Sequence, residues 1–284
     1  MSQVVLQGTP SLHRSVFPYY GGKTNQLKDI YNIMREHINS FDVVVDVFGG
    51  SGKVLLNLPD DWRKVKVYND INKELYVTFR VLQDPNKNAL LLAKLNTAFA
   101  HADIFNELKN STPETDIDIA FKVIYLQTYS YMGDGKTFGR VYKGYKTRKL
   151  DIGDWVYTKD WIIEDEDFRS LMDRYRKPRV FFYLDPPYLS SGKKYDHTFS
   201  LEDFRALRDK MDNHEGSYLL NLSSYDEEMI DIFGQPNKTI EYANPLKDHG
   251  TVKWTCGYWY KFPDNTTTPP RRYPTLDDFS EKYI

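Results

Sequence analysis

The sequence predicts an α/β fold with a doubly wound sheet, because short apolar runs alternate with stretches of helical periodicity. Four runs rich in β-branched or aromatic residues are predicted strands: residues 42–47, 65–68, 179–184 and 217–222. The first run ends in glycines, which is typical of a buried parallel strand that leads into a helix. A late aromatic run, Val252 to Phe262, is interpreted as a further strand or a hairpin.

Helical patterns lie between these strands and dominate one long interval. An apolar face at helical spacing follows the glycine pair at 21–22, through Leu27, Ile30, Met34 and Ile38. Ser200 begins another predicted helix, in which Asp203 resembles the partner residue of a capping box. Between residues 75 and 150 the alternation stops, and we expect an inserted, mostly helical subdomain. The predicted organisation is a discontinuous main domain, this insert and a C-terminal extension: residues 1–74 with 151–262, 75–150 and 263–284.

Composition and charge exclude several classes of protein. The 284 residues carry a formal net charge of −2, so any surface for nucleic acid must be local. Cys256 is the single cysteine, which excludes an internal disulfide framework and fits a reducing cytoplasm. The six histidines have no ligand spacing, so we expect no metal. Residues 1–14 lack the apolar core of a signal peptide, and no apolar run approaches the roughly 20 residues of a membrane span.

The tetrapeptide Asp185-Pro186-Pro187-Tyr188 directly follows a predicted strand. Ligands of open α/β sheets bind at the carboxyl ends of strands, and two prolines make a rigid turn without backbone donors. The Asp185 carboxylate and the Pro186 carbonyl could therefore accept both hydrogens of a planar amine such as adenine N6, stabilising positive charge on the nitrogen. Tyr188 would offer a face for stacking. A proline-rich turn with an exposed aspartate is the alternative interpretation.

A second signal is the run Phe48-Gly49-Gly50-Ser51-Gly52, after the strand that carries Asp46. Glycines let a backbone approach a ligand closely. A phosphate loop is excluded, since neither Gly52-Lys53 nor Gly22-Lys23 has the required spacing, and the dinucleotide pattern fails at Leu55. About 20 residues further on, Asp70 ends the next strand, where an acid suits a ribose diol, although a helix N-cap is the alternative.

Together these motifs resemble the DNA adenine methylase (Dam-like) family of S-adenosylmethionine-dependent methyltransferases. The resemblance rests on four segments in the family's order: Phe17-Pro-Tyr-Tyr-Gly-Gly-Lys23, Asp46-Val-Phe-Gly-Gly-Ser-Gly52, Asn69-Asp-Ile-Asn72 and Asp185-Pro-Pro-Tyr188. It spans residues 17 to about 260. It implies a Rossmann-like methyltransferase sheet that binds S-adenosylmethionine, with the insert as the target-recognition subdomain.

The resemblance also implies roles for individual residues. Tyr19 and Lys23 would line the methionine end of the cofactor, Asp46 would face its ammonium with Phe48 nearby, and Asp70 would hold the ribose. Asp160 and Trp161 look like the acid-aromatic pair placed against the cofactor adenine, and Asp185 would touch both cofactor and target amine. The expected catalytic residues are Asp185, Pro186, Pro187 and Tyr188. The expected cofactor-binding residues are Tyr19, Lys23, Asp46, Phe48, Gly49, Gly50, Gly52, Asp70, Ile71, Asp160, Trp161 and Asp185.

Two features depart from the family pattern, and a third bears on DNA binding. Tyr19 stands where the family usually has tryptophan, and the segment Tyr125–Asp134 lacks the family's Asn-Arg-Thr-like element, which leaves the target sequence open. The basic, aromatic segment Gly133–Lys149 is our candidate phosphate clamp and groove reader, with a solvated basic loop as the alternative. The expected DNA-binding residues are Lys136, Arg140, Tyr142, Lys143, Lys146 and Arg148.

We therefore expect site-specific methyl transfer from S-adenosylmethionine to N6 of an adenine flipped out of double-stranded DNA, in a bacterial or phage-infected cytoplasm. Cytosine N4, an RNA base or a protein glutamine are alternative planar amines, and a catalytically inactive DNA-binding relative is a further alternative. No nuclease motif is evident in the chain, which leaves open a solitary or phage-type enzyme and one paired with a cognate restriction nuclease.

Overall fold

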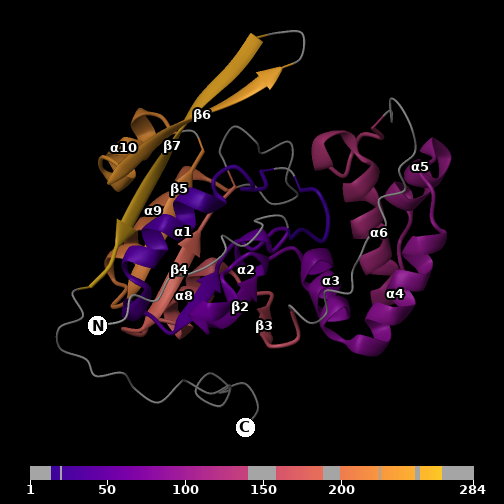
Figure 1. Ribbon diagram of the computed structural model, residues 1–284, viewed down its shortest axis with the longest axis horizontal. Coiled ribbons are helices and arrows are strands. Elements are labelled where there is room, and N and C mark those ends of the chain that lie inside the picture. Colours follow the sequence, from indigo (N-terminus) through magenta and orange to yellow (C-terminus); the bar gives the residue numbers. More distant parts are fainter. Residues whose placement is uncertain are drawn as a thin grey trace, which may run out of the picture.

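The computed structural model describes residues 14–19, 21–139, 158–187, 199–223, 225–246 and 250–263 (Figure 1). Its centre is a seven-stranded mixed sheet in the order β3-β2-β1-β4-β5-β7-β6. The strands are β1 (Val43–Asp46), β2 (Val65–Asn69), β3 (Trp161–Glu164), β4 (Val180–Leu184), β5 (Ser217–Leu222), β6 (Lys238–Leu246) and β7 (Gly250–Lys261). β1 to β5 are parallel, whereas β7 runs antiparallel to both β5 and β6. The predicted α/β class is confirmed.

The order of the strands creates a switch point in the middle of the sheet. From β1 the chain proceeds outward to β2 and β3, and it then returns to the other side of β1 for β4 and β5. Connections therefore leave β1 and β4 in opposite directions, which opens a crevice beyond the carboxyl ends of these two strands. Asp46 ends β1, and Asp185 directly follows β4.

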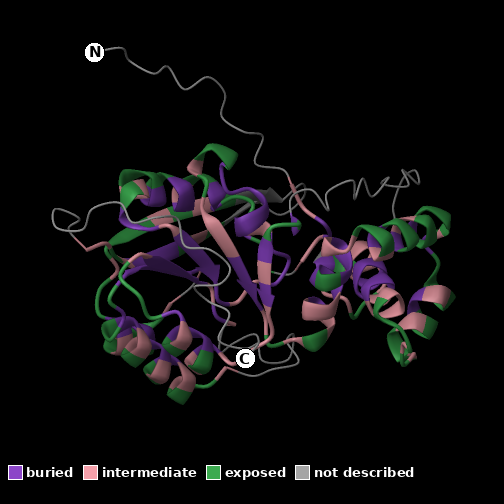
Figure 2. Cartoon of the chain, turned by 90° about the horizontal axis from the view of Figure 1, so that it is seen from below, coloured by how far each residue is buried: buried purple, intermediate pink, exposed green. Residues whose placement is uncertain are grey.

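Helices cover both faces of the sheet, as a doubly wound fold requires (Figures 1 and 2). One core contains side chains of α1 (Leu27–Glu36), α2 (Lys53–Leu56) and α3 (Lys73–Gln83), and the other contains those of α8 (Phe168–Arg174), α9 (Leu201–Asp212) and α10 (Glu227–Phe233). Side chains alternate along each strand, so Val44 lies in the first core and Val43 and Val45 lie in the second. The sheet is consequently buried on both faces.

Local signals in the sequence define two of these helices. The capping box of α9 is present, because the Ser200 side chain accepts from the Asp203 backbone and Asp203 accepts from the Ser200 backbone. Leu27, Ile30 and Met34 form the buried face of α1 as expected. Ile38 packs against the same core but lies outside the helix, because α1 ends at Glu36 and a short 3-10 turn follows.

A cluster of helices stands beside the β3 edge of the sheet (Figure 1). It consists of α3 with α4 (Pro85–Thr97), α5 (Ala102–Asn110) and α6 (Asp116–Tyr129), followed by a short 3-10 turn, η3 (Tyr131–Gly133). α6 is its centre and contacts the other three helices. The division into domains that we drew from the sequence, and the role of residues 75–150 in target recognition, stay predictions. No helix in the described ranges is long and apolar enough to cross a membrane.

Candidate active site

A cavity lies at the carboxyl edge of the sheet, where β1, β2 and β4 end. Most of the predicted cofactor and catalytic residues line it: Tyr19, Lys23, Asp46, Phe48, Gly49, Gly50, Asp70, Ile71, Asp185, Pro186 and Pro187. They belong to segments far apart in the sequence, which meet because parallel strands end at the same edge. Tyr188, Arg140, Tyr142, Lys143, Lys146 and Arg148 lie outside the described residues.

The glycine turn after β1 forms part of the cavity wall. The Gly50 N–H donates to the Asp70 carboxylate at 2.8 Å, and the Gly49 N–H donates to the Asn69 carbonyl at 2.7 Å. These bonds hold the turn against the end of β2. Gly52 does not line the cavity; it is the N-cap residue before α2 and lies in the left-handed region, with φ of 65°.

Gly49 is held against a buried aromatic ring, and this contact gives a first prediction. A Cβ at this position would overlap the ring of Tyr68, whose hydroxyl donates to the Gly50 carbonyl at 2.7 Å. We expect Gly49→Ala to cost about 1–3 kcal/mol of stability through overpacking and to weaken cofactor binding, measured by thermal melting and calorimetric titration. Gly234→Ala is the control, because its φ of 74° makes that substitution strained as well, whereas its Cβ would meet open space away from the cavity. Unchanged cofactor affinity in Gly49→Ala would contradict a role for this turn in binding.

Three carboxylates, Asp46, Asp70 and Asp185, converge on the cavity. Asp46 is 2% exposed, and its Oδ1 has no hydrogen-bond partner within the described part of the chain. Burial raises the pKa of Asp46 well above its ordinary value, and the nearby carboxylates of Asp185 and Asp70 raise it further. Lys23 acts in the opposite direction but does not offset them. The cavity therefore favours a ligand that carries positive charge.

Lys23 forms the ion pair that fixes the residue after β4. Its side chain is almost fully buried, and its ammonium contacts the Asp185 carboxylate and donates to the Gly21 carbonyl at 3.0 Å. The sequence suggested only that Lys23 lines the cavity. The contact with Asp185 joins residues 162 positions apart, and no local pattern could have predicted it.

Another part of the cavity wall is aromatic. Phe48, Phe168 and Phe199 contact one another, with ring centroids 5.5–5.8 Å apart. All three line the cavity together with Asp167, which caps α8 by accepting from the Arg169 N–H at 2.9 Å. Flat apolar walls beside an acid suit an aromatic base.

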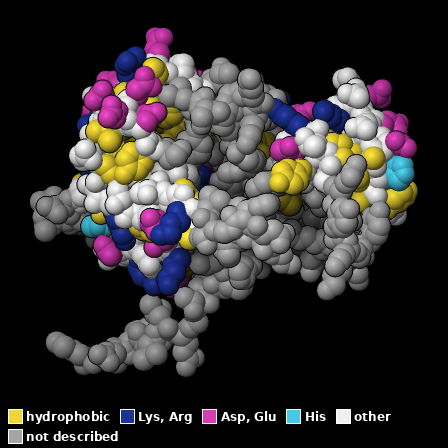
Figure 3. Space-filling view, turned by 90° about the horizontal axis from the view of Figure 1, so that it is seen from above, with side chains coloured by type: hydrophobic (Ala, Val, Ile, Leu, Met, Phe, Trp, Pro, Cys, Tyr) yellow, Lys and Arg dark blue, Asp and Glu magenta, His cyan; other side chains and the backbone are white. Residues whose placement is uncertain are grey.

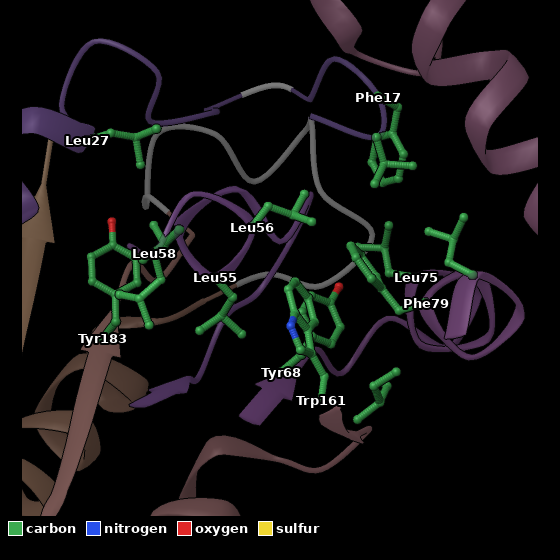
Figure 4. Packing of buried hydrophobic residues seen from close by; sticks show 14 of the residues in the cluster. Phe17, Leu27, Leu55, Leu56, Leu58, Tyr68, Leu75, Phe79, Trp161 and Tyr183 are labelled. Carbon is green, nitrogen blue, oxygen red and sulfur yellow. The ribbon is translucent and has the colours of Figure 1, made fainter. Parts of the chain in front are cut away.

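The structure contradicts the placement we expected for Asp160 and Trp161, because neither lines the cavity. They lie at the amino end of β3, where Trp161 pairs with Lys66 of β2. The carboxyl end of β3 is Glu164, which pairs with Asn69 of β2. Trp161 is 4% exposed and packs beside Tyr68 and Phe79 in the core (Figure 4). The Asp160 side chain is 85% exposed and lies near Lys159.

The acid-aromatic pair in the cavity is instead Asp167-Phe168, which sequence reasoning missed. The signal was available, since this pair follows the apolar run Trp161-Ile-Ile163 and so lies at a strand's carboxyl end. The pair Asp160-Trp161 lies at the start of β3, and therefore at the opposite edge of the sheet from the cavity.

Comparison with known proteins identifies the family. Residues 19–232 match the family model described as D12 class N6 adenine-specific DNA methyltransferase. The chain belongs to this family. The D12 family implies S-adenosylmethionine as cofactor, whose ammonium and sulfonium supply the positive charge that the three carboxylates favour. The buried, unsatisfied Oδ1 of Asp46 fits that ammonium.

Two relatives of this methyltransferase agree with its assignment to the family. The type II methyltransferase M.CviBI of Paramecium bursaria Chlorella virus NC1A is 24% identical over 198 residues, covering 65% of this chain and 72% of the relative. The modification methylase StsI of Streptococcus sanguinis is 25% identical over 215 residues, covering 69% of this chain but 32% of the relative.

Proposed function

We propose that this D12 methyltransferase transfers a methyl group to N6 of an adenine that has been flipped out of double-stranded DNA at a specific sequence. The observation that carries the proposal is the position of Asp185 and Pro186 at the switch point of the sheet, in the wall of the acidic cavity. A base within a duplex cannot bring its amino group to such a recessed site, so the target must leave the stack.

The cavity residues suggest how the cofactor would be held. Asp46 would bind the ammonium and Asp70 the ribose hydroxyls. Ile71, which is 47% exposed, and the pair Asp167-Phe168 would bind the adenine. Gly49 and Gly50 would allow the cofactor to pass close to the backbone between these two ends. When bound, S-adenosylmethionine supplies an electrophilic methyl group.

Transfer then depends on the acceptors that face the target amine. The Asp185 carboxylate and the Pro186 carbonyl would accept the two hydrogens of N6, so that its lone pair turns away from the ring and toward the methyl carbon. The N6 lone pair would accept the methyl group that S-adenosylmethionine supplies, which would leave the cofactor as the neutral thioether, and the cationic N6 would then lose one proton to solvent. Lys23 keeps the Asp185 carboxylate oriented, which is preorganisation for the positive charge that develops on N6.

The helical cluster supports the proposal for DNA binding. After α6 the chain forms a tight hairpin in which Ser130 pairs with Phe138, and Gly133 packs against the backbone of Pro18 and Tyr19 at the cavity. The predicted DNA residue Lys136 is exposed on this hairpin. On the face of the cluster seen in Figure 3, the described basic, acidic and hydrophobic side chains are interspersed.

Tyr131 gives a second prediction for this hairpin. It is 63% exposed, and its backbone N–H is fixed by the Thr137 carbonyl at 2.7 Å. We expect Tyr131→Ala to weaken DNA binding about tenfold, since stacking of one base on an aromatic ring is worth about 1–3 kcal/mol, while cofactor affinity is unchanged. Phe99→Ala is the matched control, because Phe99 is 57% exposed between α4 and α5. Equal DNA affinities of the two variants in fluorescence anisotropy would contradict a DNA contact at Tyr131.

The proposed function is tested by incubating the protein with S-adenosylmethionine labelled in the methyl group and unmethylated double-stranded DNA of varied sequence, followed by digestion to nucleosides. The expected product is N6-methyladenine at one sequence context. Label in N4-methylcytosine would contradict the substrate, and cofactor binding without transfer to any DNA would contradict the activity. Preference for a substrate with the target adenine mispaired, which lowers the cost of unpairing, would support base flipping.

A further inference from the structure

Asn69 is a buried amide at the end of β2 that none of the proposed steps uses. It is 1% exposed. Its Nδ2 donates to the Val47 carbonyl at 2.9 Å and to the Glu166 carbonyl at 3.0 Å, and its Oδ1 accepts from the Glu166 N–H at 2.8 Å. One side chain therefore bonds to the segments that follow β1 and β3, on either side of its own strand.

These bonds replace the sheet ladder where the ladder stops. Beyond the paired residues of β1, β2 and β3, the Val47 carbonyl and the N–H and carbonyl of Glu166 bond to the Asn69 side chain and not to a neighbouring strand. Buried N–H and C=O groups must find other partners. An asparagine amide has two donors and an acceptor, so it can satisfy all three groups at once.

The groups that Asn69 ties together belong to the cavity wall. Val47 and Glu166 line it, and the Asn69 carbonyl also accepts from Gly49 of the glycine turn. Directly after Asn69 comes Asp70, and directly after Glu166 comes the pair Asp167-Phe168. A change in the amide would therefore alter the distance between the residues proposed for the ribose and those proposed for the adenine.

We propose that Asn69 is a positioning residue that sets this distance and thereby the affinity for the adenosine half of the cofactor. The inference rests on the proposed assignment of the cavity to S-adenosylmethionine. Asn69 touches neither the methyl group nor the target base in this proposal, so it affects binding of the cofactor and not the chemistry of transfer.

The substitution Asn69→Asp tests the proposal because it keeps size and removes both donors. Its carboxylate would face the carbonyl oxygens of Val47 and Glu166, leaving them unsatisfied. An unsatisfied buried group that destabilises the cofactor-bound state would weaken cofactor binding about ten- to a hundredfold. We expect the Kd of S-adenosylhomocysteine and the KM for S-adenosylmethionine to rise by that factor, with kcat and the KM for DNA changed less than about twofold.

A matched control exists in Asn57, which is also buried and makes three bonds of the same kind. Its amide donates to the carbonyls of Arg14 and Lys53 at 2.8 Å, and it accepts from the Arg14 N–H at 2.9 Å. Asn57 does not line the cavity. We expect Asn57→Asp to lower the melting temperature about as much as Asn69→Asp does, without raising the Kd of S-adenosylhomocysteine.

The 5′-methylthioadenosine fragment identifies which half of the cofactor is affected. It lacks the amino-acid end, so a positioning role at the adenosine half predicts the same fold-loss for this fragment as for S-adenosylhomocysteine. Equal losses of affinity in the Asn57 and Asn69 variants, or a loss confined to kcat, would overturn the proposal. If Asn69→Asp does not fold, Asn69→Ser keeps one hydroxyl and is expected to show a smaller loss of the same kind. Failure of the wild-type protein to bind S-adenosylhomocysteine would instead overturn the proposed function.

Discussion

Replacing Asp185 with asparagine is expected to lower kcat by about a hundred- to a thousandfold, the usual effect of removing one preorganised electrostatic contact to a transition state. Asparagine keeps the shape of the side chain, but its neutral amide no longer supplies the negative charge that stabilises the cationic nitrogen formed on transfer. Cofactor binding should persist, because Asp46 and Asp70 are unchanged. Single-turnover methyl transfer beside calorimetric titration with S-adenosylhomocysteine measures both quantities.

The Lys23–Asp185 ion pair requires a control of its own, since Asp185→Asn leaves the buried Lys23 ammonium without its carboxylate partner. The double variant Lys23→Met with Asp185→Asn removes both charges. We expect it to recover thermal stability but not methyl transfer. Recovery of transfer in the double variant would show that Asp185 serves only to neutralise Lys23. Asp160→Asn, at an exposed carboxylate outside the cavity, should leave kcat unchanged.

The parts of the fold predicted from sequence are those with strong local patterns. β1, β2, β4 and β5 are short buried runs, and each lies within one residue of its predicted bounds. β3 and β6 were missed for different reasons. β3 has only four residues and is followed by a run of acids, whereas β6 is an edge strand with alternating polar residues and a proline at position 245. Their place in the sheet is decided by pairing with β2 and β7, which no local pattern contains.

The same distinction holds for the candidate site. Asp46, Asp70 and Asp185 were predictable because each ends or directly follows a recognisable strand, and parallel strands bring their ends to one edge. Asp167-Phe168 was missed because β3 was missed. The pairing of Lys23 with Asp185 and the bonds of Asn69 depend on the packing of separate segments, so only the three-dimensional arrangement reveals them.

The Asp46→Asn variant is expected to fold more stably than the wild-type protein while losing cofactor affinity about a hundredfold or more, as truncation of a buried charge pair does. In the cofactor-free protein the Asp46 carboxylate is buried beside two other carboxylates, and its pKa is raised above the unfolded value. The fold is therefore favoured at low pH, where Asp46 is protonated, and that contribution is lost as pH rises through the raised pKa. Asparagine cannot ionise and avoids the loss.

The pH dependence separates this explanation from a simple packing effect. The melting temperature of Asp46→Asn should exceed that of the wild type. This difference should widen above about pH 4, the ordinary pKa of an aspartate, and should become constant above the raised pKa of Asp46. Cofactor binding has the opposite sign, because the ammonium pairs with the ionised carboxylate. Wild-type affinity should therefore increase with pH over the same interval, with protons released on binding, as titration in buffers of different ionisation enthalpy would detect. A constant margin at all pH values, or cofactor binding without proton release below the raised pKa, would contradict the assignment of Asp46 to the ammonium.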